Sequence, residues 1–195
     1  MRAAAEVRAD VFVQLSVAVS LDGYIDDASP KRLVLSSAED LEDVRALRSR
    51  FDAVLVGAQT LRRDDPALHG AKARVVVTKS GDLDPALRFF DGSAPSIVVT
   101  TDSEVLDPRE ILERLTAHGI DSVFIEGGTR VLTAFLASGT FDALRLAVAP
   151  FFVGEADAPR VTTPARFVDD ASHRLALRGV RMLGDVAVLD YARRA

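Results

Sequence analysis

The stretch DSVFIEGGTRVLTAFLASG, residues 121–139, predicts the basic folding unit of this chain. Its first half is an apolar run that ends in Gly127-Gly128, which is typical of a buried strand followed by a turn. Its second half, residues 129–139, has the pattern of an amphipathic helix and stops at Gly139, a residue suited to a helix C-cap. A strand that passes directly into a helix indicates the α/β fold class.

Outward from this stretch, strand and helix patterns alternate. The predicted strands are residues 11–20, 53–58, 74–78, 96–100, 121–128 and 143–152, and two more around Leu183-Gly184-Asp185. The predicted helices are residues 38–50, 108–118 and 129–139, with a short helix after residue 58. We therefore expect an α/β protein with a twisted, mostly parallel sheet, flanking helices and a C-terminal antiparallel hairpin. Residues 1–10 are expected to form a flexible leader, and residues 11–195 a single domain.

The helix predicted over residues 38–50 has clear signals at both ends. Ser36 or Ser37 precedes it as an N-cap, acidic residues follow first and arginines come last, an order that suits the helix dipole. Its apolar face is expected to consist of Leu41, Val44, Leu47 and Phe51.

Composition narrows the classes of function. The 195 residues contain 24 basic and 29 acidic side chains, a net charge of −5, so nucleic acid is not an expected partner. The lack of cysteine excludes disulfides, thiolate metal sites and a cysteine nucleophile, and the three histidines show no metal-ligand spacing. No apolar run approaches the roughly 20 residues of a membrane span, and residues 1–10 lack a signal-peptide core. We expect a cytoplasmic protein with no bound metal and no membrane association.

The strongest local signal for a ligand is Glu126-Gly127-Gly128-Thr129-Arg130. Successive glycines let the backbone approach a ligand closely, and the N-terminus of the following helix offers free N–H groups to a phosphate. The alternative is an ordinary strand-to-helix turn whose glycines serve geometry alone.

Two further segments follow predicted strands. In Gly57-x-x-Thr60-x-x-x-Asp64-Asp65-Pro66, the threonine and aspartates can hydrogen-bond a nucleotide, although the segment is also compatible with a plain capped turn. Lys79 and Ser80 follow the strand 74–78 and are suited to a ribose 2′-phosphate, which would favour NADPH; a solvated loop lysine is the alternative.

Taken in order, the motifs resemble the RibD C-terminal domain family, the reductases of riboflavin biosynthesis with a dihydrofolate-reductase-like fold. The resemblance rests on SLDG (20–23), LR (47–48), VGAQTLRRDDPAL (56–68), FIEGGTRVL (124–132) and APFFVG (149–154). It implies an NADPH-dependent reductase, usually a homodimer, that acts on 5-amino-6-(5-phosphoribosylamino)uracil. A reductase of dihydrofolate or another pterin, and an NADPH-binding protein without turnover, remain as alternatives.

The resemblance also implies roles for individual residues. The residues expected to contact NADPH are Ala18, Thr60, Asp64, Lys79, Ser80, Gly127, Gly128, Thr129, Arg130, Val131 and Leu132. The residues expected on the substrate side are Glu126, Arg48, Leu68 and Lys72, with the Glu126 carboxylate accepting two N–H bonds from the pyrimidine ring. No residue is identified as the proton donor, and water is one candidate.

The chain departs from the family pattern at two places. A Ser-x-Trp-like stretch is replaced by Arg32-Leu33-Val34, and the arginine usually found beyond DDPxL is absent. Lys72 and Arg74 are the candidates to replace that arginine as a phosphate ligand. The cysteine-containing signature of the zinc deaminase domain found in the larger pathway enzyme has no counterpart here, so we expect a reductase only.

Overall fold

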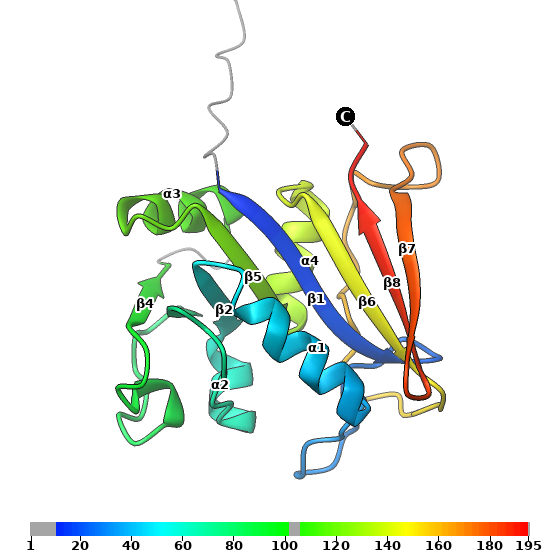
Figure 1. Cartoon of the computed structure of the whole chain (residues 1–195), viewed down its shortest axis with the longest axis horizontal. Coiled ribbons are helices and arrows are strands. Elements are labelled where there is room, and N and C mark those ends of the chain that lie inside the picture. Colours follow the sequence, from blue (N-terminus) through cyan, green and yellow to red (C-terminus); the bar gives the residue numbers. More distant parts are fainter. Residues whose placement is uncertain (1–10, 102–105, 195) are drawn as a thin grey trace, which may run out of the picture.

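The strands of the described chain form one mixed sheet (Figure 1). The structure is a computed structural model that describes residues 11–101 and 106–194; the expected leader, residues 1–10, lies outside the described residues. The strands are β1 (Phe12–Ser20), β2 (Ala53–Gly57), β3 (Arg74–Thr78), β4 (Ser96–Thr100), β5 (Ser122–Gly127), β6 (Ala143–Ala149), β7 (Ala176–Leu183) and β8 (Val186–Ala192). The helices are α1 (Ala38–Arg48), α2 (Ala58–Asp64), α3 (Pro108–Ala117) and α4 (Thr129–Ser138), with a 3₁₀ turn η1 at Arg88–Phe90.

The order of the strands places β1 in the middle of the sheet. The sheet runs β4-β3-β2-β5-β1-β6-β8-β7, and its first six strands pair in parallel. The last two strands are antiparallel and form the C-terminal hairpin on β6. The predicted α/β fold with a mostly parallel, dihydrofolate-reductase-like sheet and an antiparallel C-terminal hairpin is confirmed. Because parallel strands end at one edge, Ser20, Gly57, Thr78 and Gly127 all lie at the same edge of the sheet.

Two apolar clusters cover the two faces of the sheet. On one face, Leu55 and Ile125 pack with Ile111 of α3 and with Leu132 and Phe135 of α4. On the other face, strand residues such as Val54, Val56 and Phe124 pack with Leu61 of α2 and with Phe51. The alternation of Val54, Leu55 and Val56 between the clusters follows from the two-residue period of a strand, which explains why the central strands are apolar throughout.

Helix α1 is attached to the sheet by charge as well as by apolar contact. Its N-cap is Ser37, whose hydroxyl accepts from the Asp40 N–H, as the capping pattern predicts. Asp40 is fully buried and pairs with Arg145 of β6, and Asp43 pairs with both Arg145 and Arg181. The expectation that Leu41 belongs to the buried apolar face is wrong: the side chain is exposed, because α1 turns Asp40 toward the sheet.

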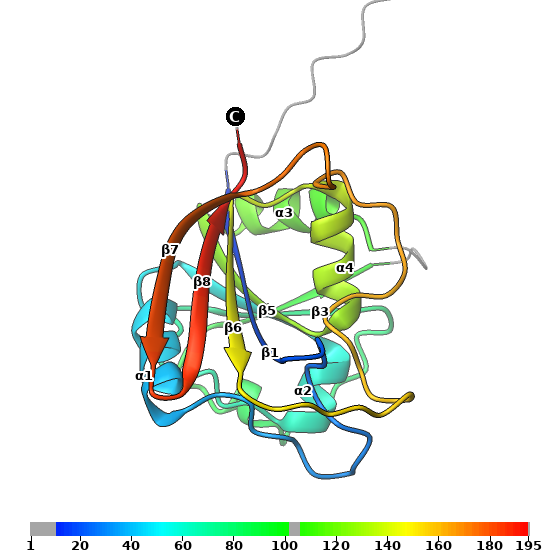
Figure 2. The ribbon, with the colours of Figure 1, turned by 90° about the vertical axis from the view of Figure 1, so that its right-hand side faces the viewer.

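Boundaries differ from the predicted ones by a few residues. The strand predicted over 143–152 ends at Ala149, because Pro150 cannot donate to the ladder, and the helix predicted over 38–50 ends at Arg48. In the part of the chain that the structure describes, no helix has the length and apolar character needed to cross a membrane. Figure 2 shows β7, β8 and β6 side by side, with α4 on the other side of the molecule and the segment after β6 running back past α4.

Candidate functional site

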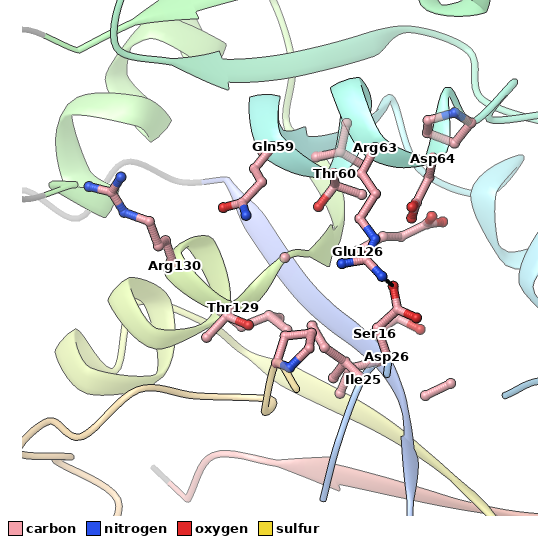
Figure 3. A pocket seen from close by; sticks show the side chains of 18 of the residues that line it. Ser16, Ile25, Asp26, Gln59, Thr60, Arg63, Asp64, Glu126, Thr129 and Arg130 are labelled. Atoms are coloured by element: carbon pink, nitrogen blue, oxygen red, sulfur yellow. Dashed lines mark ion pairs between the residues drawn. The ribbon is translucent and has the colours of Figure 1, made fainter. Parts of the chain in front are cut away.

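A cavity of about 820 Å³ opens at the edge of the sheet where the parallel strands end. Loops after β1, β2, β3 and β5 border it, together with α1, α2 and the start of α4. Figure 3 shows Thr60 and Asp64 of α2, Glu126 of β5 and Thr129 of α4 around this cavity. The predicted site residues that line it are Ala18, Arg48, Thr60, Asp64, Lys79, Ser80, Glu126, Gly128, Thr129, Arg130 and Leu132.

One end of the cavity is built from the Gly-Gly turn and the first turn of α4. Gly128 is the N-cap of this ten-residue helix and has no side chain to satisfy its first N–H groups. A Cβ atom at Gly128 would lie only 2.9 Å from the Thr60 hydroxyl oxygen, so a larger residue would crowd this wall. Gly127 has a φ of +100°, a conformation that side-chain-bearing residues rarely adopt. The turn therefore brings bare backbone and a helix N-terminus to the cavity, an arrangement suited to an anionic phosphate group.

The same end continues toward the carboxyl end of β3. Lys79, Ser80 and Thr78 line it, and Thr101 and Leu106 face them from beyond β4. Arg62 of α2 also lines the cavity and donates to the Asp82 carbonyl at 2.7 Å. Two cationic side chains, Lys79 and Arg62, therefore lie where the sequence predicts a ribose 2′-phosphate.

A neighbouring part of the cavity, beside the Gly-Gly turn, contains a two-pronged ion pair. Arg48 of α1 donates from Nε to Glu126 Oε1 at 2.6 Å and from Nη2 to Oε2 at 2.8 Å. Both side chains are mostly buried, at 15% and 17% exposed. The expected acceptor role of Glu126 toward a pyrimidine stays a prediction, and any such contact has to share the carboxylate with Arg48.

Asp64 is one of the carboxyl groups that line the cavity. It is the last residue of α2, and its Oδ1 atom is buried without a hydrogen-bond partner in the described structure. Its Oδ2 atom lies 3.6 Å from Arg32 Nε. Burial raises the pKa of Asp64 above the usual range of an aspartate, and the negative charge of Asp26 adds to that rise, whereas Arg32 and Arg63 oppose it.

Comparison with known proteins supplies the relationship that this geometry leaves open. The family model described as the RibD C-terminal domain matches residues 11–189. The chain belongs to the RibD C-terminal domain family. The relationship proposed from the motifs is thereby confirmed, and the chain is an oxidoreductase of this family.

Relatives and solved structures agree with this assignment. The chain is 31% identical to the 2,5-diamino-6-ribosylamino-4(3H)-pyrimidinone 5′-phosphate reductase of Methanothermobacter thermautotrophicus, over 92% of this chain and 97% of that protein. It is 28% identical to the riboflavin biosynthesis protein RibD of Chlamydia pneumoniae, and spans only 54% of that protein. The RibD structure from Acinetobacter baumannii superposes with a TM-score of 0.81 at 24% identity, over 96% of this chain and 59% of that one, and shows the shared fold.

Four residues predicted for the family's site do not line the cavity. Leu68 is buried in the apolar cluster that contains Leu61 of α2, and Val131 packs against Gly57. Gly127 belongs to the Gly-Gly turn, where its positive φ sets the backbone conformation, but it does not line the cavity. Lys72 is 55% exposed and pairs with Asp52 at 3.6 Å, so its predicted contact with substrate stays a prediction. Arg74, the other candidate phosphate ligand, is almost fully buried and binds Asp91, Ser93 and two carbonyl groups, which commits it to the loop after η1.

Several polar residues of this family member were not singled out from sequence. Asp26 is buried and pairs with Arg63 at 2.9 Å, while Asp40, Arg145 and Ser16 line the cavity beside the Arg48–Glu126 pair. The one available signal was an arginine inside the apolar strand 143–149, because a buried arginine requires a carboxylate. Which carboxylate it meets depends on the topology and is not visible in the sequence.

Proposed function

We propose that the chain is an NADPH-dependent reductase that converts the ribosylamino group of a phosphorylated aminopyrimidine into a ribitylamino group. The main supporting observation is a single cavity that is bordered both by a glycine turn with a helix N-terminus and by the Arg48–Glu126 pair. The family relationship supports the reaction class, since the archaeal relative is named as a reductase of such a pyrimidinone phosphate.

The residues of the first end fit a dinucleotide. Helix α4 begins after Gly128 without a side-chain cap, so its first N–H groups can donate to a pyrophosphate at the start of the helix. Lys79 and Ser80 support NADPH over NADH, because an ammonium group and a hydroxyl group suit a ribose 2′-phosphate. When bound, the reduced nicotinamide supplies a hydride. The protein positions the acceptor carbon and excludes water from it.

The residues of the second end fit a nitrogen-rich ring. Carboxylates accept N–H bonds, and Glu126 and Asp26 border this end of the cavity. Two pyrimidines are therefore proposed as substrates. The motif analysis favours 5-amino-6-(5-phosphoribosylamino)uracil, and the names of two archaeal relatives favour the 2,5-diamino-pyrimidinone.

We also propose a cytoplasmic homodimer. The exposed side chains of Val180 and Met182 on β7 support this assembly, because soluble monomers rarely keep neighbouring large apolar groups in water. Val180 and Met182 lie on one face of the hairpin. Arg181 lies on the other face, where it pairs with Asp43 of α1.

The proposed function is tested by following oxidation of NADPH at 340 nm with each pyrimidine phosphate and with dihydrofolate, in parallel with NADH. We expect turnover of a pyrimidine phosphate and a higher kcat/KM with NADPH than with NADH. The two pyrimidines are ranked by kcat/KM, which decides between a substrate with a 2-amino group and one with a 2-oxo group.

Two other results would contradict the proposal in different ways. Turnover of dihydrofolate alone would move the enzyme to a pterin substrate. Tight binding of NADPH, measured by quenching of its fluorescence, with no turnover of any of the three compounds would indicate a binding protein instead.

A further inference from the structure

Helix α1 carries Arg48 to the cavity, although little apolar packing holds the helix in place. The buried residue of α1 is a charged one, Asp40. Leu41 is exposed, and Val44 and Leu47 are only partly buried against the apolar cluster beneath them. Because apolar contacts are non-directional, this packing does not by itself fix where the helix lies along the sheet. Other contacts must therefore set its position.

One face of α1 carries an ion pair at each of two points. Asp40, Val44 and Arg48 follow one another at four-residue spacing, so they share a face, and all three line the cavity. Asp40 accepts from Arg145 of β6, and Arg48 donates to both oxygens of Glu126 of β5. Because β1 lies between β5 and β6, the two pairs are two strand spacings apart, about 10 Å. The helix rises about 12 Å from Asp40 to Arg48, so α1 spans three strands with an ion pair at either end of the span.

The Arg145 guanidinium holds α1 through two carboxylates. Its Nη2 atom donates to Asp40 Oδ1 and, at 2.8 Å, to Asp43 Oδ2, and its Nε atom donates to the same Asp43 oxygen at 3.2 Å. Arg181 of β7 binds the other oxygen of Asp43 at 3.0 Å. A planar guanidinium that bridges two carboxylates on successive turns permits one orientation of the helix. The geometry at Arg145 therefore fixes both the rotation of α1 and its position along the sheet.

Stability alone does not account for this buried pair. Asp40 and Arg145 are each 1% exposed, and Asp40 Oδ2 is buried without a hydrogen-bond partner among the described residues. Burial of a charged group that is only partly satisfied costs free energy, and replacing a buried ion pair by apolar residues is often neutral or stabilising. The position that the pair imposes on a loosely packed helix gives it a role that apolar residues would not supply.

We propose that Arg145 is a positioning residue: through Asp40 and Asp43 it sets α1 at the place where Arg48 meets both oxygens of Glu126. The inference rests on the proposed function, because it concerns the part of the cavity proposed to bind the pyrimidine. With α1 fixed, Arg48 holds the Glu126 carboxylate in one orientation toward the ring. Arg145 acts through the helix and makes no contact with the substrate.

The test replaces the whole pair in the full chain, by Asp40→Leu together with Arg145→Met, so that no charge is left buried without a partner. We expect this double variant to fold and to lose about tenfold or more in kcat/KM for the better pyrimidine phosphate. The matched control is Arg193→Met, which removes a pair with Asp169 at 3.1 Å and a bond to the Gly139 carbonyl at 2.6 Å, at the amino end of β6 and away from the cavity. Its kcat/KM should stay within about twofold of the parent.

Arg145→Lys keeps the test decisive if the double variant does not fold. Lysine leaves a positive charge beside Asp40 but cannot bridge two carboxylates as a planar fork does. We expect Arg145→Lys to be folded and to lose several-fold in kcat/KM. The dissociation constant of NADPH, from fluorescence titration, should stay within about threefold of the parent in every variant, because the glycine turn and α4 are untouched. A loss of NADPH affinity as large as the loss of kcat/KM would show a general structural defect and overturn the positioning role.

A double-mutant cycle with Glu126→Ala separates positioning from direct contact. If Arg145 acts through the Arg48–Glu126 pair, adding D40L and R145M to E126A should lower kcat/KM by no more than about twofold. Losses that multiply instead would mean that Asp40 or Arg145 acts on the substrate independently of Glu126, and would overturn the inference.

A readout without turnover makes the inference independent of substrate identity. Exchange of the Arg48 Nε–H with water, followed by ¹⁵N NMR and assigned by its loss in Arg48→Lys, reports the bond to Glu126. We expect this exchange to be at least about tenfold faster in the double variant, or in Arg145→Lys, than in the parent, and unchanged in Arg193→Met. Unchanged exchange in the Arg145 variants would show that α1 is placed by its other contacts and would overturn the inference. If the parent turns over neither pyrimidine, the proposed function fails, and the exchange rate still decides whether Arg145 positions Arg48.

Discussion

At the scale of single residues, the Arg48–Glu126 pair lies in the part of the cavity that is proposed to bind the pyrimidine. Replacing Glu126 by Ala removes the acceptor expected to face the pyrimidine and releases Arg48 from its two bonds. We expect kcat/KM for the pyrimidine phosphate to fall by about 100-fold, which corresponds to about 2.7 kcal/mol of lost transition-state binding. The dissociation constant of NADPH should change by no more than about threefold, because the glycine turn and α4 are untouched.

The matched control for this prediction is Glu110→Ala on α3, which breaks an exposed pair with Arg114 at 2.9 Å. Its kinetics should equal those of the parent. A loss of NADPH affinity in E126A as large as the loss of kcat/KM would instead make Glu126 part of the cofactor site.

The positions of several residues that line the cavity were predictable from sequence. Thr60, Asp64, Glu126 and Gly128 follow apolar runs that end in glycine or turn residues, and strand ends are where open α/β sheets bind ligands. Pairing between side chains was not predictable, because the Asp40–Arg145 contact spans 105 positions of sequence. Local pattern carries no information about which distant charge a buried arginine meets.

At the scale of elements, the position of α1 depends on charges buried beneath it. Arg145 of β6 is 1% exposed and pairs with both Asp40 and Asp43 of α1. Replacing Arg145 by Met leaves Asp40 buried and without a cation, so we expect the free energy of unfolding to fall by about 3–5 kcal/mol. Urea denaturation followed by circular dichroism measures this change.

Arg181→Met is the control for this element. Arg181 also pairs with Asp43, yet its side chain is 39% exposed, so the loss should be about 1 kcal/mol or less. Equal losses in the two variants would show that α1 is held by its apolar contacts and not by the buried pair.

For the same helix, local sequence signals predict where it begins and ends but not which of its faces is buried. The limits of α1 and its cap at Ser37 followed from local signals, since a side-chain oxygen and acidic first turn stabilise any helix start. The buried face was misjudged at Leu41, because apolar spacing assumes an apolar environment, whereas the sheet presents Arg145 to this helix.

At the scale of the whole molecule, the fold class followed from alternating strands and helices, but the strand order did not. Nothing local indicates that β1 lies between β5 and β6, or that β5 lies between β1 and β2. That order forms the candidate site, because it brings the ends of β1, β2, β3 and β5 to one cavity. Here the ordered motifs were informative only through their resemblance to a family.

The hairpin that completes this sheet carries the last prediction. Val180 and Met182 are 63% and 82% exposed, and they pair across the ladder with Leu189 and Ala187. Leu146 and Val148 of β6 lie on the same face but pack against the core, so the exposed apolar surface is centred on the hairpin. A second copy of this chain offers the same surface, and two such faces can pack together as sheets do in a core.

Replacing Val180 and Met182 together by Asp should therefore weaken the dimer by about tenfold or more, because each buried carboxylate would lack a partner. Light scattering during size-exclusion chromatography should show twice the monomer mass for the parent and the monomer mass for the double variant. Both side chains are exposed in the single chain, so the unfolding midpoint of the isolated monomer should hardly change. Val98→Asp, at an exposed position of β4, is the control and should remain dimeric. A monomeric parent, or a double variant that stays dimeric, would contradict the assignment of this face.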